Sequence, residues 1–172
     1  MREYAESLLI AAILALLIRT FIVTPFKIPT GSMEPTLKPG DKIFVNRFIY
    51  RFREPQRGDV IVFRYPEDTR RDFIKRLVAS SGETVEIKGG HLEINGKIIE
   101  QPEIFNNIQY YNRGEYGVGG NKISVPQDCY FVLGDNSLSS RDSRYWGFVP
   151  RKFLLGKAFV IWWPPLRIGK IK

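Results

Sequence analysis

The sequence predicts a mainly β protein, in which an N-terminal transmembrane helix precedes an antiparallel β-barrel or sandwich with a small β-hairpin excursion. Three observations support this fold class. A single long apolar run lies at the N-terminus. After it, apolar and polar residues alternate with the period of two that is typical of strands. Glycine and proline turn signals separate these short runs, and no long helical period interrupts them.

The apolar run predicts a membrane anchor, residues 1–24. Residues 8–18 read LLIAAILALLI, and the run extends over about 4–23, near the roughly 20 residues that a spanning helix needs. A cleaved signal peptide is a poorer interpretation because bulky residues follow the run instead of small ones. A buried helix of a soluble domain remains an alternative, since the uninterrupted part is short. Basic residues flank both ends, so charge predicts no orientation.

Residues 25–172 are expected to form the β-domain. Gly89-Gly90 and Asn95-Gly96 are favourable tight-turn dipeptides, which indicate a meander of strands and an excursion over residues 84–125. Within the excursion, residues 100–121 are rich in Asn, Gln, Tyr and Gly and are expected to form a loop or loose hairpin that projects from the core. The expected strands are 42–46, 59–65, 73–79, 84–88, 91–95, 122–125, 129–133 and 157–163.

Composition narrows the possible chemistry. The 172 residues carry a formal net charge of +8, which attracts anionic lipid or nucleic acid. The single cysteine, Cys129, excludes an intrachain disulfide, and the single histidine, His91, leaves too few ligands for a zinc site. We therefore expect no metal and no cofactor. A Ser-His-Asp triad would depend on His91 alone, so a hydrolase would need another base.

A rigid serine segment is one candidate for such chemistry. Two prolines and a glycine surround Ser32 in residues 28–37, IPTGSMEPTL, and they restrict the backbone while allowing close approach to another group. A nucleophilic serine needs a fixed, accessible setting with a backbone N–H near the oxyanion. The same segment is also compatible with a plain turn between the anchor and the first strand.

A lysine can activate a serine when burial lowers its pKa. Lys75 lies in the apolar run 72–78, DFIKRLV, where strand alternation places it on one face with Phe73 and Leu77. Arg76 falls on the other face, and periodicity alone does not choose between them. Arginine, however, does not lose its proton at a usable pH. Two basic residues on an edge strand are the alternative interpretation.

A polar loop over residues 134–147, GDNSLSSRDSRYWG, follows an apolar strand. Its serines, aspartates and arginines can form a dense hydrogen-bonded network. Asp142 and Arg144 could form an ion pair, and a serine hydroxyl could orient Lys75. A solvated loop is the simpler explanation.

Together these segments resemble bacterial type I signal peptidases, the membrane enzymes that remove signal peptides from exported preproteins. The resemblance covers nearly the whole chain, and its motifs follow in the family's order after a hydrophobic anchor. The matching segments are PTGSMEPTL at 29–37, RGDVIVF at 57–63, FIKR at 73–76, GDN at 134–136 and SRYWG at 143–147.

The resemblance implies a serine endopeptidase with Ser32 as nucleophile and Lys75 as general base. The backbone N–H of Ser32 and the hydroxyl of Thr30 would form the oxyanion hole, although many family members carry serine in place of this threonine. The supporting residues would be Ser140, Asp142, Arg144 and Asp135.

The resemblance also implies the substrate and the location. Phe26, Ile28 and Ile74 would line shallow pockets for small side chains at the −1 and −3 positions of a signal peptide. The protein would be single-pass in the cytoplasmic membrane with its catalytic domain outside the cytoplasm. Its partners would be preprotein signal peptides and the lipid bilayer, and no nucleic acid.

Two other functions remain to be weighed. A self-cleaving repressor with a Ser/Lys dyad would need a DNA-binding helical module, where this chain has an apolar segment instead. A non-catalytic, basic, membrane-tethered β-domain would explain the charge and the anchor but not Ser32, Lys75 and the Asp135 loop.

Overall fold

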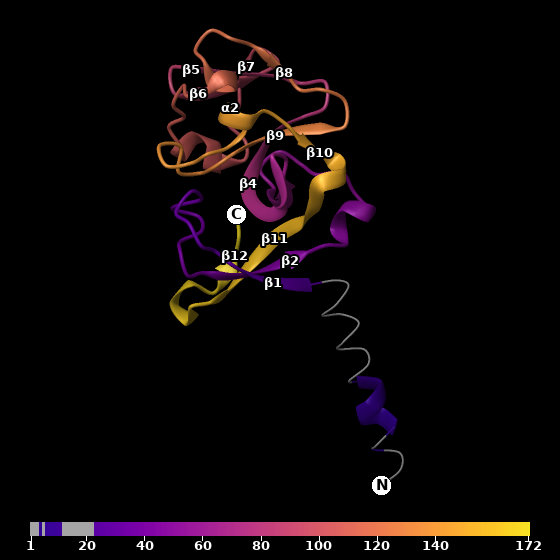
Figure 1. Cartoon of the computed structure of the whole chain (residues 1–172). Coiled ribbons are helices and arrows are strands. Elements are labelled where there is room, and N and C mark those ends of the chain that lie inside the picture. The colour runs from indigo at the N-terminus through magenta and orange to yellow at the C-terminus, as the bar shows by residue number, and fades with distance from the viewer. Residues whose placement is uncertain (1–3, 5, 12–22) are drawn as a thin grey trace.

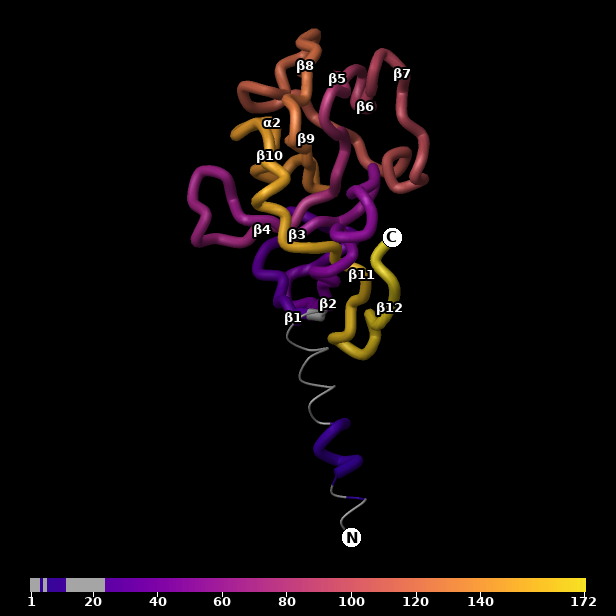
Figure 2. The backbone as a smooth tube through the Cα atoms, turned by 90° about the vertical axis from the view of Figure 1, so that its right-hand side faces the viewer, coloured from indigo at the N-terminus to yellow at the C-terminus, as the bar shows by residue number. Residues whose placement is uncertain are grey.

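The computed structural model describes residues 4, 6–11 and 23–172, of which 4 and 6–11 are helical (Figure 1). The predicted membrane-spanning segment therefore lies mostly outside the described residues. Within the described part of the chain, no helix has both the length and the apolar character needed to span a bilayer. The rest of the chain forms two antiparallel sheets joined by short 3-10 helices and turns (Figures 1 and 2).

The larger sheet has eight strands in the order β1-β2-β11-β3-β4-β9-β10, with β12 paired to β11. The described strands β1 and β10 stand at its two ends, so this part of the predicted barrel or sandwich is an open sheet. Its strands are β1 (Val23–Lys27), β2 (Lys42–Asn46), β3 (Val60–Tyr65), β4 (Asp68–Ser80), β9 (Cys129–Leu133), β10 (Val149–Pro150), β11 (Leu154–Trp163) and β12 (Gly169–Lys170).

The smaller sheet is formed by strands within residues 84–125, the range of the expected excursion. Its order is β7 (Lys97–Ile98), β6 (His91–Ile94), β5 (Thr84–Lys88) and β8 (Ile123–Ser124). The Gly89-Gly90 and Asn95-Gly96 turns have positive φ at all four positions, as tight hairpin turns require.

The segment 100–121 is a loop with two short 3-10 helices, as expected, but it does not project from the core. Phe105, Ile108 and Tyr110 are buried against the apolar face of the smaller sheet. Hydrophobic residues spaced among the polar ones therefore fold this segment back onto the core. Short helices mark it and the other connections: η2 (Ile49–Arg51), η3 (Glu103–Asn107), η4 (Glu115–Gly117), α2 (Ser143–Trp146), η5 (Arg151–Phe153) and η6 (Pro165–Arg167).

Strand β4 connects the apolar clusters of the core. Phe73 and Leu77 pack with β3 and β9, Ile74 packs with the cluster under β1 and β2, and Val78 packs against the smaller sheet. The strand begins five residues before its predicted start, because Asp68 already pairs with Tyr65 of β3. Lys75 therefore lies in the middle of a long, well-supported strand, which fixes its position.

Candidate active site

The turn that carries Ser32 connects β1 to β2. Its base is closed by hydrogen bonds from the Ile28 N–H to the Asp41 carbonyl at 2.8 Å and from the Gly40 N–H to the Ile28 carbonyl at 2.9 Å. Met33 and Leu37 are completely buried beneath the turn, while Ser32 keeps 8% of its surface exposed. The buried side chains of Met33 and Leu37 therefore hold the Ser32 hydroxyl at the surface of a packed core.

The loop after β9 clamps this turn from the other side. The Asn136 N–H donates to the Ser32 carbonyl at 3.1 Å, and the Asn136 side-chain amide donates to the Gly31 carbonyl at 3.1 Å. Gly134 lies so close that an added Cβ would stand 2.4 Å from the Ser32 carbonyl oxygen and 2.1 Å from Ser140 Oγ. Only glycine at position 134 allows this approach.

Lys75 faces Ser32 directly. Its Nζ lies 2.8 Å from Ser32 Oγ and donates a further hydrogen bond to the Ile74 carbonyl at 2.9 Å. Lys75 is 4% exposed, and its Nζ sits 5.6 Å from the centre of the Phe73 ring. The structure therefore brings together the two residues that the sequence pointed to, although 43 positions separate them.

Burial lowers the pKa of Lys75 to about 8, and the charges of Asp142 and Asp135 oppose this fall. The effect of the two carboxylates on the pKa of Lys75 is smaller than that of burial, because each carboxylate is paired with an arginine at close range. A substantial fraction of Lys75 is therefore neutral near physiological pH, which a general base requires.

Arg76, the neighbour that periodicity could not distinguish from Lys75, has a different environment. Its guanidinium binds both oxygens of Asp135, with Nε and Nη2 at 2.7 and 2.6 Å, and also donates to the Gly58 carbonyl at 2.7 Å. Thr36 donates to the same carboxylate at 2.5 Å. Arg76 and Asp135 thus tie the serine turn, β4 and the loop after β9 together behind the Ser32–Lys75 pair.

Asp142 and Arg144 form the ion pair that the sequence suggested. Both are fully buried, with Nε and Nη2 of Arg144 at 2.8 and 2.9 Å from the carboxylate. Asp142 also accepts from the Gly134 N–H at 3.0 Å, and Arg144 donates to Ser137 Oγ at 2.8 Å. The polar loop is therefore an ordered support for Gly134 and not a solvated connection.

Ser140 does not contact Lys75 through a hydrogen bond in the described structure. Its Oγ is buried and has no hydrogen-bond partner among the described residues. The residue nevertheless lies at the site, since its Oγ is the atom nearest to the Cβ position of Gly134. A small rotation of a buried, unpaired hydroxyl is inexpensive, because no existing hydrogen bond has to break.

Thr30 supplies a second hydroxyl beside the nucleophile, with its Oγ1 3.4 Å from Ser32 Oγ. The backbone N–H of Ser32 donates to no acceptor within the described residues. An unpaired N–H next to a nucleophile is available to bind a developing negative charge.

Two hollows adjoin the pair. A cleft of about 380 Å³ is lined by Ser32, Lys75, Phe73, Ser139 and Arg141, among others. Next to it lies an apolar cavity of about 40 Å³, lined by the predicted residues Phe26, Ile28 and Ile74 together with Ile43 and Val62. The sequence motifs do not include Ile43, and the motif at 57–63 includes Val62 without assigning it to a pocket; alternation indicates only that both are inward-facing strand residues.

The remaining candidates lie outside this site. His91 is exposed at the start of β6 in the smaller sheet, and Cys129 is half-buried at the start of β9. Over residues 23–172 and the described helical positions, no group of three His, Cys, Asp or Glu side chains could hold a metal ion. The buried chemistry that the structure does assemble is the serine and lysine pair.

Comparisons with known proteins show the family of the chain. Residues 1–163 match the family model described as signal peptidase, peptidase S26. The chain is 42% identical to the "Probable signal peptidase I-2" of Synechocystis, covering 97% of this chain and 75% of that one. It is 40% identical to the "Signal peptidase I" of Leptolyngbya laminosa, covering 98% and 83%.

A solved structure shares the fold. The crystal structure of a signal peptidase I from Enterococcus faecalis is 34% identical, with a TM-score of 0.50, and covers 61% of this chain and 97% of that chain. These matches show a mainly antiparallel β fold of the signal peptidase I type. The chain therefore belongs to the signal peptidase family, peptidase S26, and is a serine endopeptidase of the kind that cleaves signal peptides.

Proposed function

We propose that this chain is a membrane-bound signal peptidase in which Ser32 is the nucleophile and Lys75 is the general base. The observation that carries the proposal is the 2.8 Å contact between Lys75 Nζ and Ser32 Oγ in a buried setting. The pKa of Lys75, lowered to about 8, supports the same role. His91 is exposed at the start of β6, within the smaller sheet, and has no part in the site.

The reaction would run through an acyl-enzyme. Neutral Lys75 takes the hydroxyl proton while Ser32 Oγ bonds to the scissile carbonyl carbon, forming a tetrahedral oxyanion. The resulting ammonium gives that proton to the leaving amide nitrogen as the C–N bond breaks, which releases the mature protein. Lys75 then takes a proton from water, the hydroxide attacks the ester, and Ser32 regains its proton as the signal peptide leaves.

The oxyanion would be bound by the Ser32 N–H and the Thr30 hydroxyl. Thr30 Oγ1 already lies 3.4 Å from Ser32 Oγ, so its hydroxyl hydrogen can turn toward the substrate oxygen. Preorganised donors of this kind contribute about 10²–10³ in kcat each. The Asn136 clamp on the Ser32 and Gly31 carbonyls holds the peptide plane and therefore the direction of the N–H.

Selectivity for small side chains would come from the apolar hollows beside Ser32. The cavity of about 40 Å³ between Phe26, Ile43 and Ile74 holds only a small group. A substrate side chain larger than that of alanine would have to displace the buried residues Ile43 in β2 and Val62 in β3. Each misfitting methylene is worth about 1–3 kcal/mol of discrimination.

An extended substrate would lie along β1. This strand pairs with β2 on one side only, so its other edge offers unpaired backbone groups in the described structure. A peptide strand added at this edge would gain main-chain hydrogen bonds, while alternate side chains would enter the hollows. The edge leads directly into residues 28–32, so the peptide would reach Ser32.

Residues 4–23 would anchor the chain in the cytoplasmic membrane, with the catalytic domain on the extracytoplasmic side. The supporting observation is the apolar sequence itself, which has the length of a spanning helix. Because β1 begins at Val23, the anchor would end where the substrate-binding edge starts. The cleavage site of a signal peptide would meet Ser32 close to the membrane surface.

The test is cleavage of a purified preprotein, with sequencing of the new N-terminus. Ser32→Ala and Lys75→Ala should each reduce cleavage to background, because each removes one half of the proposed dyad. Ser81→Ala and Lys97→Ala change exposed residues on other turns and strands and should cleave like the original chain. Cleavage retained by either dyad variant, in a folded protein, would refute the mechanism.

A further inference from the structure

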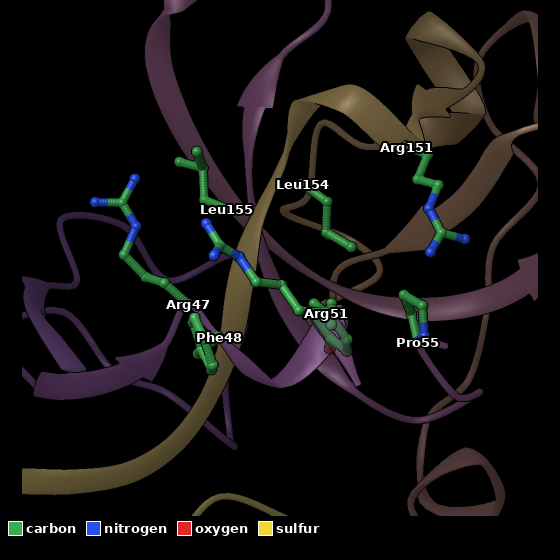
Figure 3. A pocket seen from close by; sticks show the side chains of 8 residues that line it. Arg47, Phe48, Arg51, Pro55, Arg151, Leu154 and Leu155 are labelled. Carbon is green, nitrogen blue, oxygen red and sulfur yellow. The ribbon is translucent and has the colours of Figure 1, made fainter. Parts of the chain in front are cut away.

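A second pocket lies apart from the Ser32 cleft. Its volume is about 460 Å³, and Arg47, Arg51 and Arg151 surround it (Figure 3). The two pockets share no lining residue. The wall between the arginines is largely apolar, and includes Phe48, Tyr50, Leu154 and Leu155.

Two of the three arginines, Arg47 and Arg51, have no ion-pair partner among the described residues. Arg151 is paired with Glu54, with Nη2 2.7 Å from the carboxylate. Arg47 and Arg51 are exposed, and neither has an ion pair with any described residue. The pocket therefore presents two free guanidinium groups, which are suited to bind phosphate oxygens.

The segment that carries these arginines is held rigidly. The side-chain oxygen of Asn46 accepts hydrogen bonds from the N–H groups of Phe48 at 2.9 Å and Ile49 at 3.0 Å. Tyr50 donates to buried Asp59 at 3.1 Å, and the Arg51 guanidinium lies 4.8 Å from the centre of the Phe48 ring. An anion would meet a preformed backbone, which lowers the entropy lost on binding.

The pocket adjoins the point where the proposed anchor ends. Asn46 pairs with Val23, the first residue of β1, and Arg47 follows immediately. Figures 1 and 2 place β1, β2 and β12 at the same end of the domain. Phe52, which follows the pocket segment and lies with its ring centre 5.0 Å from that of Phe48, is 78% exposed. An exposed apolar side chain beside free arginines is typical of a surface that meets lipid headgroups.

We propose that this pocket binds the phosphate of an anionic phospholipid headgroup. Arg47 and Arg51 would contact the phosphate oxygens, and the apolar wall would contact the glycerol and the first acyl carbons. The inference rests on the proposed membrane location of the chain, not on its catalytic residues. The contact would fix how the domain stands on the membrane and thus the height of Ser32 above it.

The test is native mass spectrometry of the full chain in a neutral detergent, titrated with short-chain phosphatidylglycerol. Phosphatidylcholine of the same chain length and inorganic phosphate are titrated in parallel. The chain should retain one phosphatidylglycerol, with at least about tenfold weaker retention of the other two. Arg47→Gln/Arg51→Gln should weaken phosphatidylglycerol binding about tenfold or more, because each basic residue near a lipid headgroup contributes about fivefold.

The matched control is Lys97→Gln/Lys122→Gln, which removes the same charge from two exposed residues, one in β7 of the smaller sheet and one just before β8. It should bind phosphatidylglycerol within about twofold of the original chain. Equal loss in both double variants, or equal retention of phosphatidylcholine, would overturn the proposal. Inorganic phosphate binding as tightly as the lipid would exclude a headgroup as the preferred occupant.

The same titration with Ser32→Ala separates this inference from the proposed mechanism. The substitution should abolish cleavage and leave lipid binding unchanged, since Ser32 lines the other pocket. Lost lipid binding in this variant would contradict an independent headgroup site. Unchanged lipid binding together with retained cleavage would refute the mechanism alone.

Discussion

Replacing Lys75 by methionine should stabilise the fold at neutral pH while abolishing catalysis. Methionine keeps the length and the apolar stem of lysine but carries no charge. Lys75 is 4% exposed, so the folded state holds its ammonium group away from water. The unfolded chain has no such restriction. The lowered pKa of Lys75 is therefore also a statement about stability.

The magnitude follows from the pKa. Its fall from 10.5 to about 8 corresponds to about 3 kcal/mol of folding free energy, given about 1.4 kcal/mol per pH unit. Below pH 8 both states hold the proton and the folded state carries the whole cost. Between pH 8 and 10.5 the folded state loses its proton first, so the cost declines and then vanishes. The lost hydrogen bonds to Ser32 and Ile74 cost about 1 kcal/mol each, which leaves a net gain of about 1 kcal/mol at pH 7.

Urea unfolding of the full chain in a neutral detergent, followed by tryptophan fluorescence, would measure the effect from pH 7 to 9.5. The stability difference between Lys75→Met and the original chain should fall by about 2 kcal/mol between pH 8 and 9.5. Lys97→Met, at an exposed position of β7, should differ from the original chain by less than about 0.5 kcal/mol at every pH. If the stability difference between Lys75→Met and the original chain does not change with pH, then burial of a charged Lys75 does not cost folding free energy, and the reasoning is refuted.

Three further outcomes are expected for catalysis. With chemistry rate-limiting, peptide cleavage should rise about tenfold per pH unit below the Lys75 pKa of about 8 and level off above it, and a flat profile from pH 6 to 10 would contradict the neutral base. Thr30→Val keeps the shape of the side chain but removes the hydroxyl, so kcat should fall about 10²–10³-fold while Thr30→Ser recovers most of it. Ile43→Ala enlarges the small cavity, so kcat/KM for substrates with valine or leucine at one recognition position should rise about tenfold relative to kcat/KM for substrates with alanine there. If this ratio is unchanged, the cavity is not a specificity pocket.

Much of the fold follows from local sequence. The eight expected strands coincide with observed ones, because alternation and turn dipeptides are local signals. The expected strands do not include β1, which begins inside the expected anchor, or β7, β10 and β12, which have two residues each and give no periodic pattern. The expected projection of residues 100–121 from the core is wrong for a different reason. Phe105 and Tyr110 are buried by contact with a sheet formed elsewhere in the chain, which composition does not reveal.

The site was less accessible to sequence reasoning than the strands. A rigid serine turn and a lysine in an apolar run were both visible, but only the family's motif order joined Ser32 to Lys75. The register of β3 with β4, which pairs Ile61 with Lys75, fixes the direction of the lysine. Ile43 and Val62 became site residues through sheet order, because β2 and β3 are separated in the sheet by β11. No local sequence pattern predicts which distant strands become neighbours in the sheet.

The Asn136 clamp also has a consequence for when the enzyme becomes active. Its side-chain amide reaches back 105 positions to the Gly31 carbonyl, and Asp135 reaches back 59 positions to Arg76. A growing chain that has not yet emerged past residue 136 therefore possesses both Ser32 and Lys75 but lacks the groups that align them. We therefore expect hydrolysis to begin only when synthesis has passed residue 136, which leaves the last 36 of the 172 residues to follow.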